Sequence, residues 1–425
     1  MSLAIGPAEW PPCRRPNGGC RPPKPGRTVR AADRVGPPGV GGCAVRLVAA
    51  TSWDDDLLHG MRGLPVQSVF GKLQRDLVGG GRPASVLPPV DWDAMARHIA
   101  LAHSLNFRFL YLWNAASLGD AEYDASYVAA MERQVRELVA IGVDGLVVGM
   151  PWMIPLAKGV SPDLEVSVSS MIAVVSPREA RQFEAMGADT IILHHSANRD
   201  FRQLEEVRAS VHCDLELILN NSCVYQCPYA ACHHVSPAFH SRAGSADVLE
   251  YELFWCAGRY AQDGAEIIRA RWIRPEDLGF YEARGYDRFK IAGRGRDTAW
   301  LLRAVQAYAA RSYPGDLTDI ISMSQHAPLR VARQRAADDH NPNAPAWTEI
   351  AESLEPVSQL AVDNPAIPAD FLHFFSQHDC NTLSCRACGY CGQVAARAVR
   401  GVRGRDRDGA PRMPAAHMFG DLRLG

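Results

Sequence analysis

Short apolar, β-branched runs alternate with amphipathic stretches from about residue 44 onward, and this alternation restricts the fold more than any other feature of the chain. It is typical of repeated βα units. We expect strands at residues 45–51, 66–71, 107–113, 143–149, 164–170, 189–195, 215–221, 266–272 and 288–293. Roughly eight or nine units in about 270 residues predict an α/β fold with a closed (βα)8 barrel of the TIM-barrel type, and an open doubly wound sheet is the alternative.

The segments between these runs have the pattern of amphipathic helices. They carry apolar residues at i, i+3 or i+4, and several begin with a Ser or Asp that can cap a helix. We expect helices at residues 91–105, 124–142, 176–187, 200–211, 275–285 and 297–312.

The rest of the chain divides by composition. Residues 1–43 are rich in Pro, Gly and Arg and lack hydrophobic periodicity, so we expect them to be disordered. The barrel is expected over residues 44–315. It is followed by a Pro- and Asp-rich linker at 316–350, a small cysteine-rich accessory region at 351–398 and a basic, disordered tail at 399–425.

Polar side chains follow several of the predicted strands. In a TIM barrel the active site lies where strands end and loops begin, which singles out Asn114, His195 and Asn220 for hydrogen bonding or proton transfer. Lys290 and Arg294 flank another strand end, where two cations suit an anionic substrate such as a carboxylate. Taken singly, each of these residues is equally well explained as a cap or as a hydrogen-bonded core residue.

Eight of the twelve cysteines form two sets of four, the number of thiolates that one metal centre needs. The first cysteine set is Cys223, Cys227, Cys232 and Cys256, and the second cysteine set is Cys380, Cys385, Cys388 and Cys391. Four cysteines between residues 380 and 391 are too crowded for two unstrained disulfides. We expect an iron–sulfur cluster at the first set and a second cluster at the C-terminal set, where zinc is the alternative. His233 and His234 follow Cys232, so a mixed Cys/His zinc site stays open at the first set.

Composition indicates an ordinary globular protein, with a formal net charge of −2 that does not favour binding to nucleic acid. An apolar run of about 18 residues, which a membrane span needs, is missing, as is the apolar core of a signal peptide. A reducing compartment keeps clustered cysteines as thiolates. We therefore expect a cytoplasmic protein that acts on a small-molecule substrate, works with a partner subunit or an electron donor, and does not bind a membrane.

Residues 45–315 resemble peptidase family U32, the collagenase-like proteins. The resemblance rests on LVAIGVDGLVVG, VSVSSMIAVVSPREARQFEAMGADTIILHH, LELILNNSC and DLGFYEARGYDRFKIAGRGRDTAWLLRAVQAY. Lys290, Gly293 and Arg294 match the family, which typically has an acidic residue in place of Ala292. The resemblance implies a TIM-barrel-like domain and a cluster in the region of the first cysteine set, although the family commonly has wider gaps among its cysteines.

Members of this family are associated with oxygen-independent hydroxylation in ubiquinone synthesis and with hydroxylation of tRNA and ribosomal RNA bases. Several resemble [4Fe–4S] proteins that take the hydroxyl oxygen from prephenate. The resemblance therefore implies an iron–sulfur oxidoreductase that hydroxylates, or otherwise modifies by redox chemistry, a small carboxylate-bearing or biosynthetic metabolite. The alternatives are a U32-type peptidase, for which the chain has neither a Gly-x-Ser-x-Gly nor a His-Glu-x-x-His motif, and a non-catalytic metal-binding partner subunit.

Overall fold

A computed structural model describes residues 45–245, 252–323, 326–338, 340–341 and 344–401. The disorder predicted for residues 1–43, and for all but the first three residues of the 399–425 tail, lies outside these ranges. From Val45 onward the described residues belong to one compact unit.

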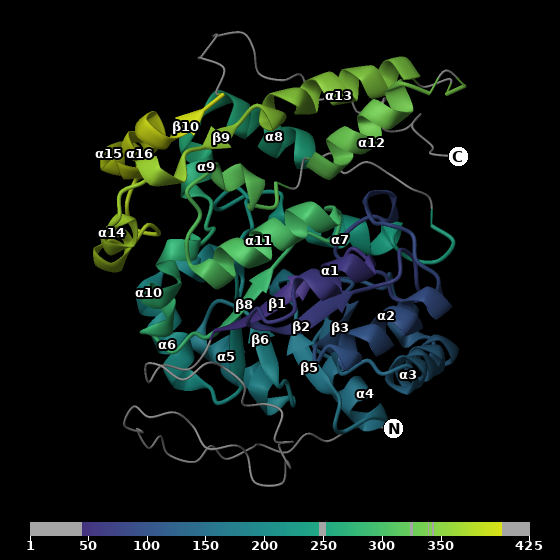
Figure 1. Cartoon of the computed structure of the whole chain (residues 1–425). Helices are drawn as coiled ribbons and strands as arrows, with labels where there is room; N and C mark the ends of the chain where they lie inside the picture. The colour runs from purple at the N-terminus through teal and green to yellow at the C-terminus, as the bar shows by residue number, and fades with distance from the viewer. Residues whose placement is uncertain (1–44, 246–251, 324–325, 339, 342–343, 402–425) are drawn as a thin grey trace. The chain divides into compact units, whose positions relative to one another are not determined.

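Eight parallel strands form a closed barrel in sequence order (Figure 1). Every strand pairs with the next, and β8 pairs with β1 through Leu47 and Phe289, which closes the sheet. The strands are β1 Arg46–Ala50, β2 Val66–Gly71, β3 Arg108–Trp113, β4 Gly145–Val148, β5 Glu165–Val168, β6 Thr190–Ile192, β7 Asp214–Ile218 and β8 Arg288–Ile291. The predicted (βα)8 barrel is confirmed, and the open sheet is excluded.

Helices follow the strands of the barrel. They are α1 Asp55–Gly60, α2 Trp92–Ser104, α3 Ala125–Ala140, α4 Met153–Val160, α5 Pro177–Ala185, α6 Phe201–Ser210, α10 Leu278–Glu282 and α11 Thr298–Ala310. As the sequence predicts, Asp side chains cap α2, α3, α6 and α11. Ser176 and Glu179 form a reciprocal capping box at α5, which explains why this helix begins sharply at Pro177.

Further elements lie in the long β7–β8 connection and after α11. They are α7 Ala230–His240, α8 Glu252–Gln262, α9 Ala265–Arg269, α12 His326–Ala336, α13 Ala344–Ser358, β9 Ala361–Val362, α14 Phe371–Gln377, α15 Cys385–Cys388, α16 Tyr390–Ala398 and β10 Val399–Arg400. Short 3-10 turns are η2 Ala84–Val86, η3 Ala121–Tyr123, η4 Ser170–Ile172, η5 His195–Arg199, η6 Pro275–Asp277, η7 Leu317–Asp319 and η8 Asn364–Ala366.

The predicted strand at 266–272 is wrong, because this segment begins as helix α9 and continues as an extended link. Ile267 and Ile268 are both fully buried, and a short, wholly buried apolar run has no periodicity that separates a helix from a strand. Glu266 pairs with Arg269 three residues later, a spacing that brings the two side chains together on a helix.

The predicted linker at 316–350 is also wrong, since it contains η7, α12 and the start of α13. Helices α12 and α13 pack against each other, as Figure 1 shows, and α13 also packs against α8. Later in the chain, β10 pairs antiparallel with β9, so Val399 and Arg400, the first residues of the predicted tail, form a strand. Pro328 and Pro345 lie in the first turns of α12 and α13, where a proline is compatible with a helix.

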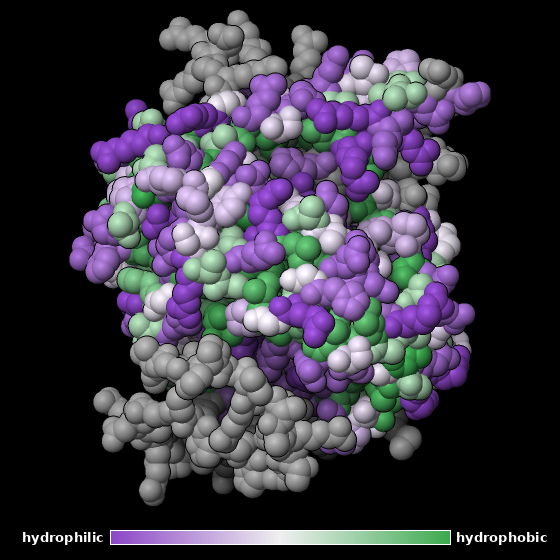
Figure 2. Space-filling view, in the orientation of Figure 1, coloured by the Kyte–Doolittle hydropathy of each residue, from purple (hydrophilic) through white to green (hydrophobic). Residues whose placement is uncertain are grey.

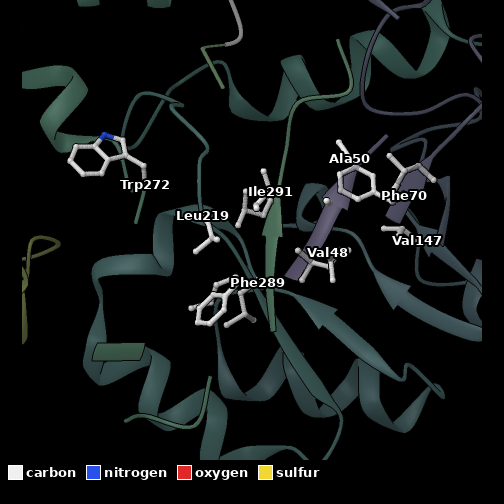
Figure 3. Packing of buried hydrophobic residues seen from close by; sticks show 14 of the residues in the cluster. Val48, Ala50, Phe70, Val147, Leu219, Trp272, Phe289 and Ile291 are labelled. Atoms are coloured by element: carbon white, nitrogen blue, oxygen red, sulfur yellow. The ribbon is translucent and has the colours of Figure 1, made fainter. Parts of the chain in front are cut away.

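The hydrophobic core lies between the barrel and its helices. Side chains alternate along each strand, so Phe289 and Ile291 face away from the barrel axis while Arg288 and Lys290 face into it. Figure 3 shows β1 and β8 side by side, with the buried Val48 on β1 and the buried Phe289 and Ile291 on β8. Hydrophilic residues cover most of the face in Figure 2, and hydrophobic residues are interspersed among them. Within the described ranges, no helix has the length and apolar character needed to cross a bilayer.

Candidate active site at the mouth of the barrel

A pocket with about 1300 Å³ of empty space opens where the barrel strands end. Its floor is made by inward-facing strand residues, namely Phe70, Leu112, Val147, Ile192, Ile218 and Lys290. Its walls come from the loops that follow the strands, including Arg82, Asn114, Ser169, His195, Asn221 and Arg294. The pocket therefore occupies the end of the barrel that carries the active site in TIM-barrel enzymes.

The pocket is positively charged. Arg82, Lys290, Arg294 and Arg296 line it, and the described lining contains no Asp or Glu. A concave surface with charges of one sign concentrates ligands of the opposite sign. The pocket thus suits an anionic small molecule.

Arg294 is the cation in the pocket with the weakest internal pairing. Its Nη1 atom is buried and has no hydrogen-bond partner, and the described residues offer it no carboxylate ion pair. Burial, and then the nearby charge of Arg82, lowers the pKa of Arg294 to about 9. Asp76 acts on Arg294 only through space and is itself paired with Lys72, so Arg294 is suited to bind an anion from outside the chain.

Lys290 already has a carboxylate inside the barrel. Its ammonium lies 3.3 Å from Glu216, which also accepts a 2.8 Å hydrogen bond from Arg288. Arg288 continues to Glu165 at 2.8 Å, and Glu165 pairs with Arg108 at 2.5 Å. Burial lowers the pKa of Lys290, while Glu216 opposes this effect. Lys290, at the pocket floor, is therefore the last member of a buried network in which positively and negatively charged side chains alternate.

Three imidazoles gather beside the pocket. The ring of His194 lies 4.1 Å from that of His195 and 6.0 Å from that of His234, measured between centroids. Burial lowers the pKa of His194 and of His234 to about 4, and it holds the pKa of His195 well below its usual value. All three rings are neutral near pH 7, so each can accept a proton or donate a hydrogen bond.

The structure brings Asn114 to the pocket but not Asn220. The Asn114 amide lies 3.3 Å from the Ser169 hydroxyl, and its buried Oδ1 has no partner. The Asn220 amide donates to the carbonyls of Ala292 and Ile320 and accepts from the Ala292 N–H at 2.8 Å. These bonds occupy the Asn220 side chain in holding the end of β8 in place.

The first cysteine set is only partly assembled. Cys223 lines the pocket, and its backbone N–H is fixed by Asn221 Oδ1 at 2.7 Å. Burial raises the pKa of Tyr260 well above its usual value, and the nearby Cys256 and Cys223 thiols, with Cys227, raise it further. Cys232 is exposed on α7.

Across the described ranges, no three His, Cys, Asp or Glu side chains meet closely enough to hold one metal ion. Cys256, Cys223 and Cys227 nevertheless all lie within electrostatic reach of the Tyr260 hydroxyl. Their donor chemistry fits an iron–sulfur cluster.

Several residues that line the pocket do not follow the end of a predicted strand, so their place in the site could not be predicted from the strand ends. Arg82 follows a run of three glycines after β2, and this Gly-rich loop at a strand end is the signal that could have found it. Arg296 stands two residues after Arg294 in the same loop. His234 reaches the pocket from α7, and Met323 from the segment after α11; no strand-end rule predicts either residue.

Comparison with known proteins gives a consistent assignment. The model of Peptidase family U32 matches residues 89–248. An uncharacterized protease of Methanocaldococcus jannaschii is 30% identical over 247 residues, which cover 58% of this chain and 73% of that protein. The solved structure of a U32 peptidase is 17% identical, with a TM-score of 0.46, and the match covers 62% of this chain and 98% of the other. The chain belongs to peptidase family U32.

Proposed function

We propose that this chain is a redox enzyme that modifies a small, carboxylate-bearing metabolite at the barrel mouth, by oxygen-independent hydroxylation or a related reaction. The observation that carries the proposal is the pocket charge. Arg294 presents a buried, unpartnered nitrogen there, and no described carboxylate lines the pocket to neutralise it. A substrate carboxylate supplies the missing counter-charge through charge-assisted hydrogen bonds.

The other lining groups have complementary roles. Asn114 offers an unpartnered Oδ1 to a substrate hydroxyl or amine. The neutral rings of His195 and His234 offer ring nitrogens that donate or accept hydrogen bonds to a substrate. The apolar floor of Phe70 and Leu112 excludes water and strengthens the electrostatic contacts.

The first cysteine set would hold the cofactor of this reaction. Cys223 joins that set to the pocket, since it lines the pocket and lies within electrostatic reach of Tyr260 together with Cys227 and Cys256. An iron–sulfur cluster, when bound, supplies one-electron chemistry that no side chain of the pocket offers.

A peptidase is the second candidate, because the relatives of this chain are called proteases. Hydrolysis needs an activated nucleophile or a metal-bound water. Ser169 lines the pocket, but its hydroxyl lies against Asn114 and accepts from the Met171 N–H, and neither is a base that could activate it. Cleavage of peptides by protein freed of metal with a chelator would favour this second candidate over the redox enzyme.

Replacement of Arg294 by Gln tests carboxylate binding. We expect prephenate, titrated calorimetrically into the anaerobic protein, to bind at least about tenfold more weakly to the variant, since a hydrogen bond to a charged group contributes about 1.5–3 kcal/mol. Arg311→Gln is the matched control, because Arg311 pairs with Glu282 on the outer surface. Equal affinity in the Arg294→Gln and Arg311→Gln variants would sink the proposed carboxylate site.

A further inference from the structure

The second cysteine set converges on one pocket outside the barrel mouth. Cys380, Cys385, Cys388 and Cys391 all line this pocket, which has about 370 Å³ of empty space. Helix α15 places Cys385 and Cys388 three residues apart, which directs both thiols to one side. Gly389 then adopts a left-handed conformation (φ +66°) that ends α15, and α16 begins at the next residue with Cys391 in its first turn.

The rest of the pocket wall includes three aromatic side chains and Arg269, whose charge is paired with Asp263 and Glu266. Phe374 stacks on Tyr390 with centroids 3.9 Å apart, and Phe375 meets the same ring edge-on at 5.8 Å. Both phenylalanines line the pocket with the cysteines. An apolar wall of this kind shields a metal–thiolate centre from water and so controls its redox potential.

Two buried arginines lie beside this cysteine pocket without a carboxylate partner among the described residues. The Arg199 guanidinium donates to the carbonyls of Ile268 and Trp272 and lies 5.2 Å from the centroid of Phe375. Arg271 lies 5.6 Å from the same ring. Each has a buried Nε without a hydrogen-bond partner.

The electrostatics connect these arginines with the thiols. The charges of Arg199 and Arg271 both act on the Cys391 thiol through space. Burial, and then the charge of Arg271, lowers the pKa of Arg199 to about 10. Two like charges buried near each other need an anion, and a centre held by four thiolates is one.

We propose that the second cysteine set binds an iron–sulfur cluster whose negative charge is balanced by Arg199 and Arg271. The Cys-x2-Cys-x2-Cys run is typical of ferredoxin-type ligation, and the aromatic pocket encloses the four thiols together. The two arginines are tuning residues, since they contact Phe375 of the pocket wall and act on the thiols through space without being ligands. The cluster site stands independently of the reaction proposed for the barrel mouth.

A hydrogen bond places this site next to the first cysteine set. Tyr225, between Cys223 and Cys227, donates to Asn381 Oδ1 at 2.8 Å, and Asn381 directly follows Cys380. The guanidinium of Arg271 covers the Tyr225 ring at 3.8 Å from its centroid. The loop of the first set and the ligand loop of the second are therefore in direct contact.

Metal analysis of the anaerobically purified full chain tests the site. With Cys223 and Cys232 both changed to Ser, we expect about four iron and four sulfide per chain to remain, with an electron paramagnetic resonance signal after dithionite reduction. With Cys385 and Cys388 changed to Ser in addition, the remaining iron and this signal are lost. Zinc without sulfide, or an iron content unchanged by the additional Cys385 and Cys388 substitutions, would overturn the proposal. Retention in the Cys223/Cys232 variant upholds this site even if the barrel-mouth cluster does not exist.

Arg271 provides a test that does not depend on folding of a cysteine variant. We expect Arg271→Gln, made in the chain with all its cysteines, to lower the midpoint potential of the cluster at the second cysteine set, because a nearby positive charge favours the reduced form. Arg271→Lys keeps the charge and should stay close to the parent potential. Equal potentials in the Gln and Lys variants contradict the role given to Arg271 and, with it, the proposed charge balance.

Discussion

Replacement of Glu216 by Gln should destabilise the protein by about 3–5 kcal/mol, because it removes the one charge that separates two buried cations. Glu216 is 1% exposed and pairs with both Arg288 and Lys290. Gln has nearly the same shape, so the loss reports charge rather than volume. Unfolding in urea, followed by circular dichroism at pH 7, measures the change in the free energy of unfolding.

The matched control is Glu205→Gln, since Glu205 pairs with Arg284 on the surface and its side chain is 58% exposed. A surface ion pair contributes about 0–1 kcal/mol, so this variant should stay near the parent. Equal losses in the free energy of unfolding for the two Gln variants would show that the buried charges contribute no more to stability than a surface ion pair does.

Acidification from pH 7 to pH 5 should weaken the fold through its buried histidines. The unfolded chain binds a proton at each imidazole near pH 6.5, whereas folded His194 and His326 do so only near pH 4. Their contribution to stability is therefore present above the unfolded pKa and is lost as the pH falls toward the folded one. For His194 this amounts to about 2 kcal/mol between pH 7 and 5.

His194→Asn isolates this effect. The Asn amide oxygen can replace Nδ1, which lies 2.7 Å from the Ser196 hydroxyl, but it does not titrate. We expect the variant to lose about 2 kcal/mol less than the parent between pH 7 and 5, from urea unfolding at each pH. His59→Asn, at an exposed position of α1, should leave the pH dependence unchanged. Parallel curves for the parent and His194→Asn would contradict burial as the cause.

The barrel could be predicted because the sequence pattern of each strand and helix lies within the element itself. Eight of the nine expected strands overlap the observed ones, since each is a β-branched run between helices with capping residues. The failure at 266–272 has a physical reason: Ile267 and Ile268 are buried on every side, and burial alone does not favour a strand over a helix. The linker expected at 316–350 is helical because α12 and α13 pack against each other, and amino-acid composition does not predict such packing.

Residues of the candidate site could be predicted only where they directly follow the end of a barrel strand. Asn114, His195, Lys290 and Arg294 line the pocket, as the strand-end rule predicts. The same rule wrongly includes Asn220, because the pattern of a strand end cannot show that an amide is already saturated by the Ala292 backbone. Arg82 was missed because a Gly-rich loop, rather than a strand, positions it.

The β9–β10 ribbon brings together the two ends of the segment that carries the second cysteine set. Val362 pairs with Val399, so the segment 363–398 leaves and re-enters the fold at one place. A segment with adjoining ends can be gained, lost or exchanged during evolution without rethreading the rest of the chain, because its removal leaves a gap that a tight turn closes. The cysteine-bearing segment therefore enters and leaves the fold at one place, yet α16 packs on α9 and Asn364 bonds to Glu276, so the rest of the chain holds it in position.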